Sequence, residues 1–376
     1  MVGPSYPFKG GIAQFTTRLF RELAARHEVV FLSFKRQYPS WLYPGETDKD
    51  FSDTDLRDER VIPTIDPLSP LSWYRTAKTL AQSSPDLVIF PWWIMFWGPP
   101  FVCMILILRI KLKDTRILFL CHNVVAHEPS WLSKVLTRLT LRRGDAFLVQ
   151  SDEDEASLCE MLNNPDVARF DHPSYDLSDE LLIDQQQAQT RLGLEGDVIL
   201  FFGFIRPYKG LRYLLEAMPR VLRTQKCTLL VAGESWGEKE EYLQLIDELG
   251  IKGHVLWKEG YIPQEQVSEI FSASDLVVLP YTSATGSGVV KLAYSYHRPV
   301  IVSDVGSLPA AVDVGSTGYV VNAEDSTSLA DAILTFFQGE NQLEMSANIA
   351  RRVRDFSWDE LTQKVELLAS GNYTSH

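Results

Sequence analysis

The sequence predicts an α/β protein of the doubly wound class, with that architecture present twice in one chain. Short apolar and β-branched runs alternate with helix-length amphipathic stretches, and such unbroken apolar strands are typical of parallel sheets covered on both faces. A length of 376 residues suits two domains better than one. The polar stretch Ser174–Thr190 separates the two series of runs. We therefore expect Rossmann-like domains over residues 1–176 and 177–355, followed by a C-terminal helix over 356–376.

The expected strands are short and apolar, and a helix-length stretch follows each of them. The first, Met1–Gly3, is so short that it leaves open whether residues precede Met1. The other strands of the first domain are expected at Glu28–Phe34, Asp86–Phe90, Arg116–Cys121 and Ala146–Gln150. Those of the second domain are expected at Asp197–Phe202, Cys227–Ala232, His254–Lys258, Asp275–Pro280 and Pro299–Ser303.

One apolar segment, Leu87–Leu108, is long enough to raise the question of a membrane span, which takes about 20 residues. Pro91, Pro99 and Pro100 interrupt it, and a proline inside a helix costs about 3 kcal/mol. We therefore favour a buried strand, a turn and an apolar helix from Pro99 to Leu108.

Composition limits the partners and the compartment. Lysine and arginine number 36 against 49 aspartates and glutamates, a formal net charge of −13, and so acidic a chain repels nucleic acid. The four cysteines lie far apart and show no metal-ligand spacing, which is typical of buried thiols in a reducing compartment. The first residues have neither a basic leader nor a long apolar run. We expect a cytoplasmic protein, with peripheral contact at the inner face of the plasma membrane as an open addition.

Three loops between a strand and a helix have the composition of anion-binding turns. Glycine lets backbone N–H groups approach an anion, and a helix N-terminus adds its dipole. The first loop carries Gly10 and Gly11, ahead of a helix expected from Gly11 to Arg26. The second carries Arg206 and Lys209, whose guanidinium fork and ammonium group both suit phosphate oxygens.

The third loop carries Gly286, Ser287 and Gly288 and opens another helix. The N–H groups of Gly288, Val289 and Val290 would therefore point at an anion. Each loop by itself also fits an ordinary turn or a solvated surface charge. The three together indicate a ligand held in a cleft between the domains.

A histidine, His122, stands directly after the expected strand Arg116–Cys121. This is the edge at which open α/β sheets bind ligands. The residues alone leave open whether His122 faces a ligand or serves the structure. His127 and Glu128, a little farther along, are explained as well by capping of the next helix.

In order and spacing, these motifs resemble those of the family 4 glycosyltransferases, which are retaining enzymes of the GT-B fold. The resemblance covers nearly the whole chain and implies two Rossmann-like domains facing across a cleft, with the last helix crossing back onto the first domain. Besides the loops above and the pair His122-Asn123, it includes Gly260-Tyr-Ile-Pro-Gln-Glu265, Ser274–Pro280, Arg298–Gly306, Gly318–Val321 and the terminal Phe356-Ser-Trp358.

The resemblance implies a role for each matching position of the first domain and of the cation loop. The Gly10-Gly11 backbone would approach the donor's phosphates or its sugar. His122 would hold the transferred sugar near the reacting carbon. Arg206 and Lys209 would neutralise the diphosphate leaving group.

Two further positions of the second domain match the family's donor site. Tyr261 and Ile262 would line the base pocket, mostly through backbone groups, and the turn Gly286–Val290 would cradle phosphate and sugar hydroxyls. The family's two glutamates, eight positions apart, fall here on Ala284 and Leu292. The resemblance therefore assigns neither the identity of the donor nor the ribose contact.

The expected reaction transfers a sugar from a nucleotide diphosphate sugar, UDP favoured and GDP next, to an acceptor hydroxyl with retained configuration. No carboxylate pair is available for double displacement, so the family-like route is front-face attack with the leaving phosphate as base. No Asp-X-Asp motif occurs in these loops, so we expect no cofactor and no obligatory metal. A non-catalytic nucleotide-sugar-binding partner and a nucleotide-sugar epimerase remain as alternatives.

The acceptor is expected to be a saccharide or lipid-linked saccharide in bacterial cell-surface or exopolysaccharide synthesis. Between residues 101 and 145, eight basic residues oppose three acidic ones, which leaves 8 − 3 = +5. Trp92, Trp93, Trp97 and Trp131 lie nearby in sequence. This stretch either contacts anionic membrane or is a solvated helix face above core tryptophans, and both interpretations stay open.

Overall fold

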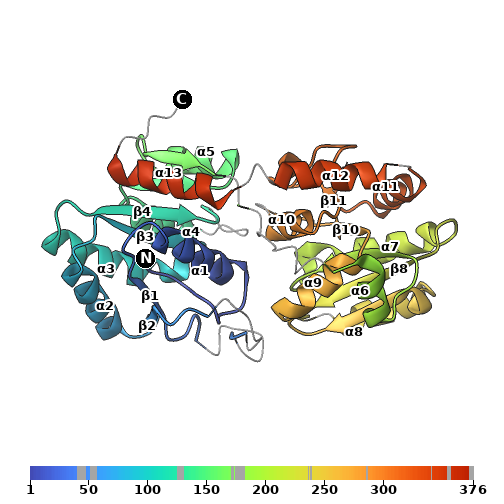
Figure 1. Ribbon diagram of the computed structural model, residues 1–376, viewed down its shortest axis with the longest axis horizontal. Coiled ribbons are helices and arrows are strands. Elements are labelled where there is room, and N and C mark those ends of the chain that lie inside the picture. Colours follow the sequence, from blue (N-terminus) through green and yellow to red (C-terminus); the bar gives the residue numbers. More distant parts are fainter. Residues whose placement is uncertain are drawn as a thin grey trace. The chain divides into compact units, whose positions relative to one another are not determined.

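The computed structural model describes residues 1–39, 48–50, 57–124, 131–170, 173, 183–235, 237, 239–284 (264 by its backbone alone), 287–339, 341–353 and 357–371. The chain divides into two compact units (Figure 1). The first comprises Met1–His172 and Trp358–His376, and the second comprises Pro173–Ser357. The last helix thus belongs to the first unit.

The first unit contains a four-stranded parallel sheet, in the order β3-β4-β5-β6, and a parallel pair, β1-β2. The predicted strand at Met1–Gly3 is reduced to a parallel bridge between Val2 and Leu32. The strands of this unit are β1 (Phe31–Phe34), β2 (Val61–Ile65), β3 (Leu87–Trp92), β4 (Arg116–Cys121), β5 (Ala146–Val149) and β6 (Val167–Arg169).

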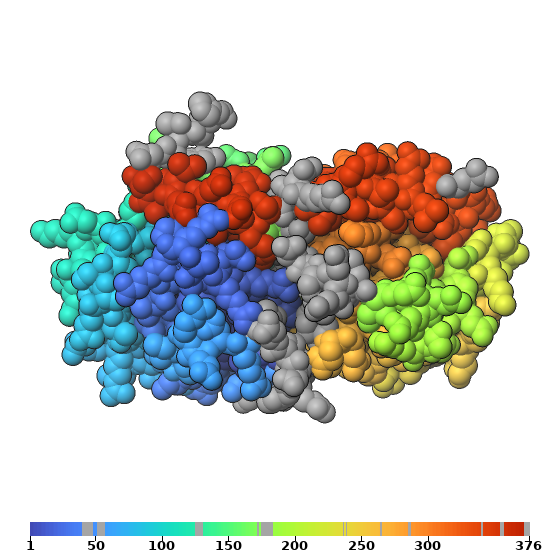
Figure 2. All heavy atoms as spheres, in the orientation of Figure 1, coloured from blue at the N-terminus to red at the C-terminus, as the bar shows by residue number. Residues whose placement is uncertain are grey.

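Helices cover both faces of this sheet. Along β4, Phe119 packs in one core with α2 and α3, whereas Leu118 and Leu120 pack in a second core with α1 and α13. Figure 2 shows α13, in red, against the blue N-terminal residues that include α1. The helices of this unit are α1 (Gly11–Ala24), α2 (Pro70–Gln82), α3 (Gly98–Lys111), α4 (Trp131–Leu141), α5 (Asp152–Met161) and α13 (Trp358–Ser370).

The apolar segment Leu87–Leu108 forms β3, a single 3-10 turn at Met95–Trp97 and the first part of α3. Within the parts of the chain that the structure describes, no helix is both long and apolar enough to cross a membrane. Trp92 and Trp97 are fully buried in the core of the first unit. The apolar character of the segment is therefore explained by burial.

The second unit is built on one six-stranded parallel sheet in the order β12-β11-β10-β7-β8-β9. The order reverses between β7 and β10. Because these two neighbouring strands are parallel, the loops that follow them leave the same edge of the sheet. The strands are β7 (Asp197–Phe202), β8 (Cys227–Gly233), β9 (Val255–Glu259), β10 (Leu276–Leu279), β11 (Val300–Ser303) and β12 (Gly318–Val321).

Helices also cover both faces of this second sheet (Figure 1). Alternate residues of β7 belong to different cores: Phe201 packs with α7 and α11, and Leu200 packs with α9 and α10. The helices are α6 (Gln185–Leu192), α7 (Leu211–Val221), α8 (Lys239–Glu248), α9 (Gln264–Ala273), α10 (Gly288–Ser295), α11 (Ser326–Gln338) and α12 (Gln342–Val353).

The structure differs from the sequence prediction in three short strands and one helix. Strands β2, β6 and β12 were not expected; β2 is an exposed edge strand that contains Pro63, which weakens its strand signal. The predicted linker Ser174–Thr190 lies partly outside the described residues, but Gln185–Thr190 belong to helix α6. The glutamines of this helix leave it without an apolar pattern in the sequence. Asp184 caps its N-terminus, and Ala188 is completely buried.

Candidate active site

The candidate site of the second unit is formed by the loops that follow β7 and β10. Two hydrogen bonds join these loops: Thr282 donates to the carbonyl of Tyr208 from its backbone N–H (2.8 Å) and from its hydroxyl (3.3 Å). The structure therefore brings the predicted cation loop together with the loop that leads to α10.

Lys209 is the central side chain of this site. It lies in a 3-10 turn at Pro207–Lys209, and only 9 % of its surface is exposed. Its Nζ lies 5.3 Å from the centroid of the Tyr281 ring, within the range of a cation–π contact. Burial lowers the pKa of the ammonium group; Tyr208 opposes this shift, and the charge of Arg206 has a smaller effect that lowers the pKa further.

The buried ammonium has no carboxylate partner among the residues that the structure describes. Burying a charge without a counter-charge is unfavourable, since the water that solvated it is not replaced. An anionic ligand at this point would supply the missing partner. The arrangement can therefore bind and neutralise a phosphate group.

Two glycines make room for this arrangement. A Cβ at Gly203, where φ is +104°, would lie 3.0 Å from the Lys209 Nζ, so the ammonium rests directly against the β7 loop. A Cβ at Gly210, where φ is +66°, would lie 1.9 Å from the Pro280 carbonyl oxygen. Only glycine allows the cation loop to approach the end of β10 this closely.

Arg206, the second predicted cation, is exposed. Its guanidinium carbon lies 5.7 Å from the centroid of the Tyr208 ring, and that ring meets Tyr281 edge-on at 6.2 Å. The guanidinium is therefore held above the same aromatic pair that borders Lys209. Because water screens an exposed charge, Arg206 is expected to contribute less than Lys209 to anion binding.

In the turn before α10, a side chain of the turn itself already occupies a backbone N–H group at the start of the helix. Ser287 caps the helix: its hydroxyl accepts from the Val289 N–H (3.2 Å), and its carbonyl accepts from the Val290 N–H (3.3 Å). The Tyr281 hydroxyl lies 3.3 Å from the same Ser287 Oγ, and burial raises the pKa of Tyr281 to about 12. An anion would reach the Val289 N–H only by replacing Ser287, while Gly288 stands exposed at the helix start.

Tyr261 and Ile262 follow β9, two strands from β7 in the sheet order. Ile262 is buried in the core, so its contribution to a ligand site would come from its backbone.

The loop after β8 lies between the loops of β7 and β9 and was not singled out from the sequence. Its Gly233-Glu234-Ser235 is joined to the β7 loop by a bond from the Ile205 N–H to the Glu234 carbonyl (2.9 Å). Its position after an apolar strand was the available signal.

The positions of the two family glutamates are apolar in structure as well as in sequence. Ala284 and Leu292 are half-buried and pack against the core formed by β7, β10 and α10. Their side chains can make no charged or hydrogen-bonding contact with a sugar or a ribose. Gly286 of this loop lies outside the described residues, as do His127 and Glu128 of the first unit.

In the first unit, His122 follows β4 at the carboxyl edge of the sheet. Its N–H donates to the Trp92 carbonyl (2.8 Å), and its ring meets Phe15 edge-on at 5.1 Å. Its Nδ1 lies 3.0 Å from the amide nitrogen of Gln150, which follows β5. Because an amide nitrogen donates, Nδ1 accepts and the ring proton is placed on Nε2.

Gln150 was not singled out from the sequence, although a polar residue directly after an apolar strand was a usable signal. Gly11 begins α1 one turn before Phe15, and Gly10 precedes it with φ of +105° and no side chain that caps the helix. The predicted Gly10-Gly11 turn and His122 thus belong to one edge of the first unit.

Among the described residues of both units, no cluster of three histidine, cysteine or acidic side chains could hold a metal ion.

Two family models match the chain in succession. Residues 10–169 match a glycosyl transferase 4-like domain, and residues 196–338 match the glycosyl transferases group 1. The chain belongs to the family 4 glycosyltransferases. These matches divide the chain as its two units do, and they confirm the resemblance that its motifs indicate.

Among curated relatives of this glycosyltransferase chain, the D-inositol 3-phosphate glycosyltransferase of Mycobacterium marinum is 34% identical over 261 residues, which cover 66% of this chain and 54% of that protein. The enzyme of the same name from Mycobacterium bovis is 33% identical over 240 residues, 60% of this chain and 48% of its own. The chain therefore spans about half the length of the curated relatives it matches.

Solved structures confirm the GT-B fold. The sucrose-phosphate synthase of Thermosynechococcus elongatus matches with a TM-score of 0.76 at 18% identity, over 98% of both chains. Anabaena HepE in complex with UDP-glucose matches with a TM-score of 0.72 at 16% identity, again over 98% of both chains.

Proposed function

We propose that this protein is a retaining glycosyltransferase that moves a sugar from a nucleotide diphosphate sugar, most favourably a UDP-sugar, to an acceptor hydroxyl. One observation carries the proposal: the buried ammonium of Lys209 lies at the carboxyl edge of β7 without a carboxylate partner in the described structure. A diphosphate is the anion that this family's donors would bring to such a position. The UDP and UDP-glucose complexes of the structural neighbour HepE support that donor class.

The two cations of the loop have distinct roles in this proposal. Lys209 contacts the diphosphate and stabilises the charge that develops as the sugar–phosphate bond breaks, and Arg206 adds a weaker, solvent-screened contribution. The apolar side chains of Ala284 and Leu292 exclude a carboxylate nucleophile at those positions. We therefore propose front-face attack of the acceptor, with the departing phosphate accepting its proton. We also propose that this site needs no obligatory metal, because Lys209 and Arg206 supply the positive charge.

His122 is proposed to contact the transferred sugar through its Nε2–H, with Gln150 holding the ring by its Nδ1. This assignment follows from the tautomer, which leaves a donor on the side of the ring away from Gln150. A neutral donor of this kind suits a sugar hydroxyl.

The acceptor is proposed to be a saccharide or lipid-linked saccharide of bacterial cell-surface or exopolysaccharide synthesis, reached at an anionic membrane surface. Helix α4 supports the membrane contact, because it buries its hydroxyl-bearing face, Ser133, Thr137 and Thr140, and exposes an apolar one. The exposed apolar residues are Trp131, Leu132, Val135 and Leu139, and the exposed cations among them are Lys134, Arg138 and Arg142.

The tryptophans of the first unit do not all support a membrane surface. Trp92 and Trp97 are core residues, and half-buried Trp93 donates to the Tyr38 hydroxyl (2.9 Å), so Trp131 alone of the four is exposed. Two of the basic residues, Arg109 and Arg116, form ion pairs with Asp145 and Asp166. The proposed surface is therefore α4 itself, not the whole stretch between residues 101 and 145.

The experiment that tests the donor site is calorimetric binding of UDP-glucose, UDP-galactose, UDP-N-acetylglucosamine, GDP-mannose and ADP-glucose to the full chain. One tight binder, weakened at least about tenfold in Lys209→Ala and unchanged in Lys252→Ala, is the expected result. Lys252 is an exposed lysine paired with Asp247 in the same unit, so it controls for the loss of a charge. Equal binding by both variants would contradict the assignment of Lys209.

A second arm separates the transferase from its alternatives. A transferase releases free nucleotide when a sugar acceptor is supplied. Binding without any release would favour the non-catalytic partner, which Ala284 and Leu292 support. Conversion of the donor's sugar without an acceptor would favour the epimerase.

A further inference from the structure

The first turn of α13 packs close to His122. Trp358 begins this helix and is the first residue of the first unit after the second unit ends at Ser357. Its indole is buried, with 8% of its surface exposed, and the ring centroid lies 5.3 Å from that of Phe15 on α1. Phe15 in turn meets the His122 ring at 5.1 Å. The point at which the chain returns to the first unit is therefore separated from His122 by a single aromatic ring.

The orientation of the His122 ring depends on its neighbours, because the last side-chain torsion of a histidine is broad and roughly two-fold. Gln150 holds the ring at Nδ1, 3.0 Å away. A hydrogen bond at one ring atom still lets the ring pivot about that atom. Phe15 restricts this movement, since the two ring planes are perpendicular (89°), an arrangement that aromatic pairs prefer. The position of Phe15 therefore contributes to the direction of the Nε2–H of His122.

Phe15 keeps its position because it is enclosed. None of its surface is exposed, and the rings of Trp358 and Phe170 pack on it with centroids 5.3 and 6.0 Å away. All three side chains belong to the core that α1 and α13 form with β4 and β5. Such cores are close-packed and transmit strain. Removal of the indole would leave a cavity beside Phe15, into which that ring could move.

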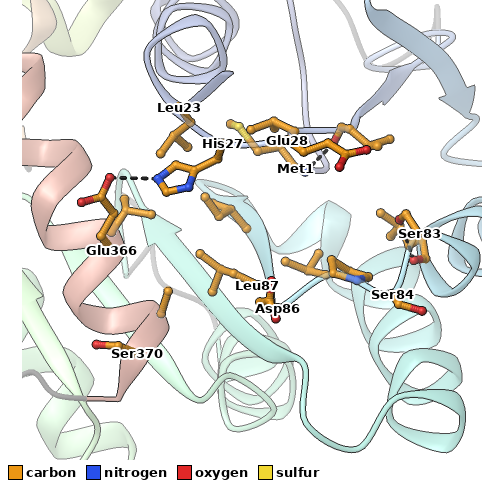
Figure 3. Close-up of a pocket in the computed structure, with 18 residues that line it drawn as sticks. Met1, Leu23, His27, Glu28, Ser83, Ser84, Asp86, Leu87, Glu366 and Ser370 are labelled. Atoms are coloured by element: carbon orange, nitrogen blue, oxygen red, sulfur yellow. Dashed lines mark hydrogen bonds and ion pairs between the residues drawn. The ribbon is translucent and has the colours of Figure 1, made fainter. Parts of the chain in front are cut away.

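The other end of α13 is held differently. Figure 3 shows Glu366 of α13 and His27, which follows α1, reaching toward one another, and their side chains are 2.9 Å apart. This pair is exposed to water and adds little to the hold on the helix. The last turns of α13 also border a cavity of about 600 Å³ (Figure 3). Leu368 is nevertheless completely buried in the same core as Trp358, about 15 Å along the helix from it.

We propose that Trp358 is a positioning residue for the transfer reaction, which holds the imidazole of His122, through Phe15, in the orientation that the transferred sugar needs. The proposal rests on the role proposed above for His122. It gives the first turn of α13 a part in the chemistry, whereas the rest of the helix serves the stability of the first unit. Trp358 itself contacts neither donor nor acceptor in this scheme.

A second route from Trp358 to the donor has to be separated from this one. Phe15 lies one turn after Gly11, whose backbone is proposed to approach the donor, so a displaced α1 would act there instead. The two routes differ in one respect. Only the route through His122 loses its effect on turnover when His122 is already absent.

The first test needs no substrate. In protein labelled selectively at histidine, the ring signals of His122 are identified by their loss in His122→Ala. They report the ring current of Phe15 and the tautomer of the imidazole. Trp358→Ala is expected to shift or broaden these signals, whereas Leu368→Ala, which empties another part of the same core, is expected to leave them in place. Equal responses to the two substitutions would overturn the proposal.

Trp358→Leu keeps most of the apolar contact without an aromatic ring. It is expected to produce the same change in smaller measure, so the comparison does not depend on the folding of Trp358→Ala. Trp358→Phe, which keeps a ring against Phe15, is expected to restore the parent signals. No change with either Trp358→Ala or Trp358→Leu would also contradict the proposal.

The kinetic test follows UDP release from UDP-glucose with water as the acceptor. Trp358→Ala and Leu368→Ala are both expected to lower the Tm, but only Trp358→Ala is expected to lower kcat, by about tenfold. The Kd of UDP should stay the same in both, because the diphosphate is proposed to bind at Lys209 in the second unit. In the His122→Ala background, Trp358→Ala should change kcat by less than about twofold.

A tenfold loss of kcat that persists without His122 would overturn the route through the imidazole. So would equal losses in Trp358→Ala and Leu368→Ala. A parent chain with no turnover would contradict the proposed function instead, and the ring signals of His122 would then decide by themselves whether Trp358 positions that ring.

Discussion

The ammonium of Lys209 lies 5.3 Å from the centre of the Tyr281 ring, although the two residues are more than seventy positions apart in the chain. The contact exists because β7 and β10 are neighbours in the parallel sheet of the second unit. An aromatic face partly compensates a cation that has lost its water, but it does not replace an anion. In the proposed donor site, the buried charge of Lys209 thus lowers the stability of the unit and at the same time provides the group that binds the donor.

Replacing Lys209 by methionine separates these two properties. Lys209→Met keeps most of the volume and removes the buried charge, so the second unit is expected to gain about 1–2 kcal/mol of unfolding free energy. Donor binding is expected to be lost at the same time. Thermal unfolding and calorimetry on one preparation measure both. A variant that is less stable and still binds donor would show that the ammonium is already satisfied.

Donor affinity is expected to depend on pH through Lys209. Its pKa in the free protein is lowered by burial, and a bound diphosphate would raise it, because the anion favours the charged form. Affinity should therefore be constant well below the free-protein pKa and fall as pH rises through it. Calorimetric titrations between about pH 6 and pH 10 test this, with Lys209→Ala expected to show a flatter profile. Identical profiles would exclude Lys209 as the titrating group.

Gly210 and Gly250 form a matched pair for testing the close approach of the cation loop to β10. Both have φ near +66°, but a Cβ at Gly210 would lie 1.9 Å from the Pro280 carbonyl, whereas one at Gly250 meets nothing within 4 Å. Gly250→Ala is expected to cost about 1 kcal/mol of backbone strain. Gly210→Ala is expected to cost clearly more and to weaken donor binding. Equal Tm losses would contradict this packing.

Gln150 is expected to act on the reaction through His122. His122→Ala should lower turnover by about 10²-fold, and Gln150→Ala by about tenfold through loss of the ring orientation. The double variant should be no slower than His122→Ala. The nitrogen chemical shifts of His122 should show Nε2–H in the parent chain and a mixture of tautomers in Gln150→Ala. Additive losses would mean that the two residues act independently.

Helix α4 is expected to bind anionic vesicles at low salt. Trp131→Glu should abolish pelleting with phosphatidylglycerol vesicles, and reversal of Lys134 and Arg138 to glutamate should reduce it, since apolar insertion and charge act together. Leu343→Glu, at an apolar position of the second unit that is 87% exposed, is the control and should change nothing. No pelleting by the parent chain would remove the membrane surface from the proposal.

The strands most accurately predicted were those whose signal is local. Arg116–Cys121 and Asp197–Phe202 were predicted with the bounds that the structure has, because a central parallel strand is apolar along its whole length. The edge strand β2 and the glutamine-rich helix α6 carry weaker patterns and were missed. Arg206 and Lys209 could be singled out from the sequence because two cations that closely follow an apolar strand can be recognised without knowing which strands are neighbours in the sheet.

The sequence by itself determined the two doubly wound units and the family, since both depend on periodicity and on motifs with fixed spacing. The tertiary structure decided which residues meet and which are buried. It buried Lys209 against Gly203 and Tyr281 while leaving Arg206 exposed. It also placed Trp97 in the core and Trp131 at the surface. Burial and contact depend on strand order and helix packing, and these bring together positions whose separation along the chain carries no signal.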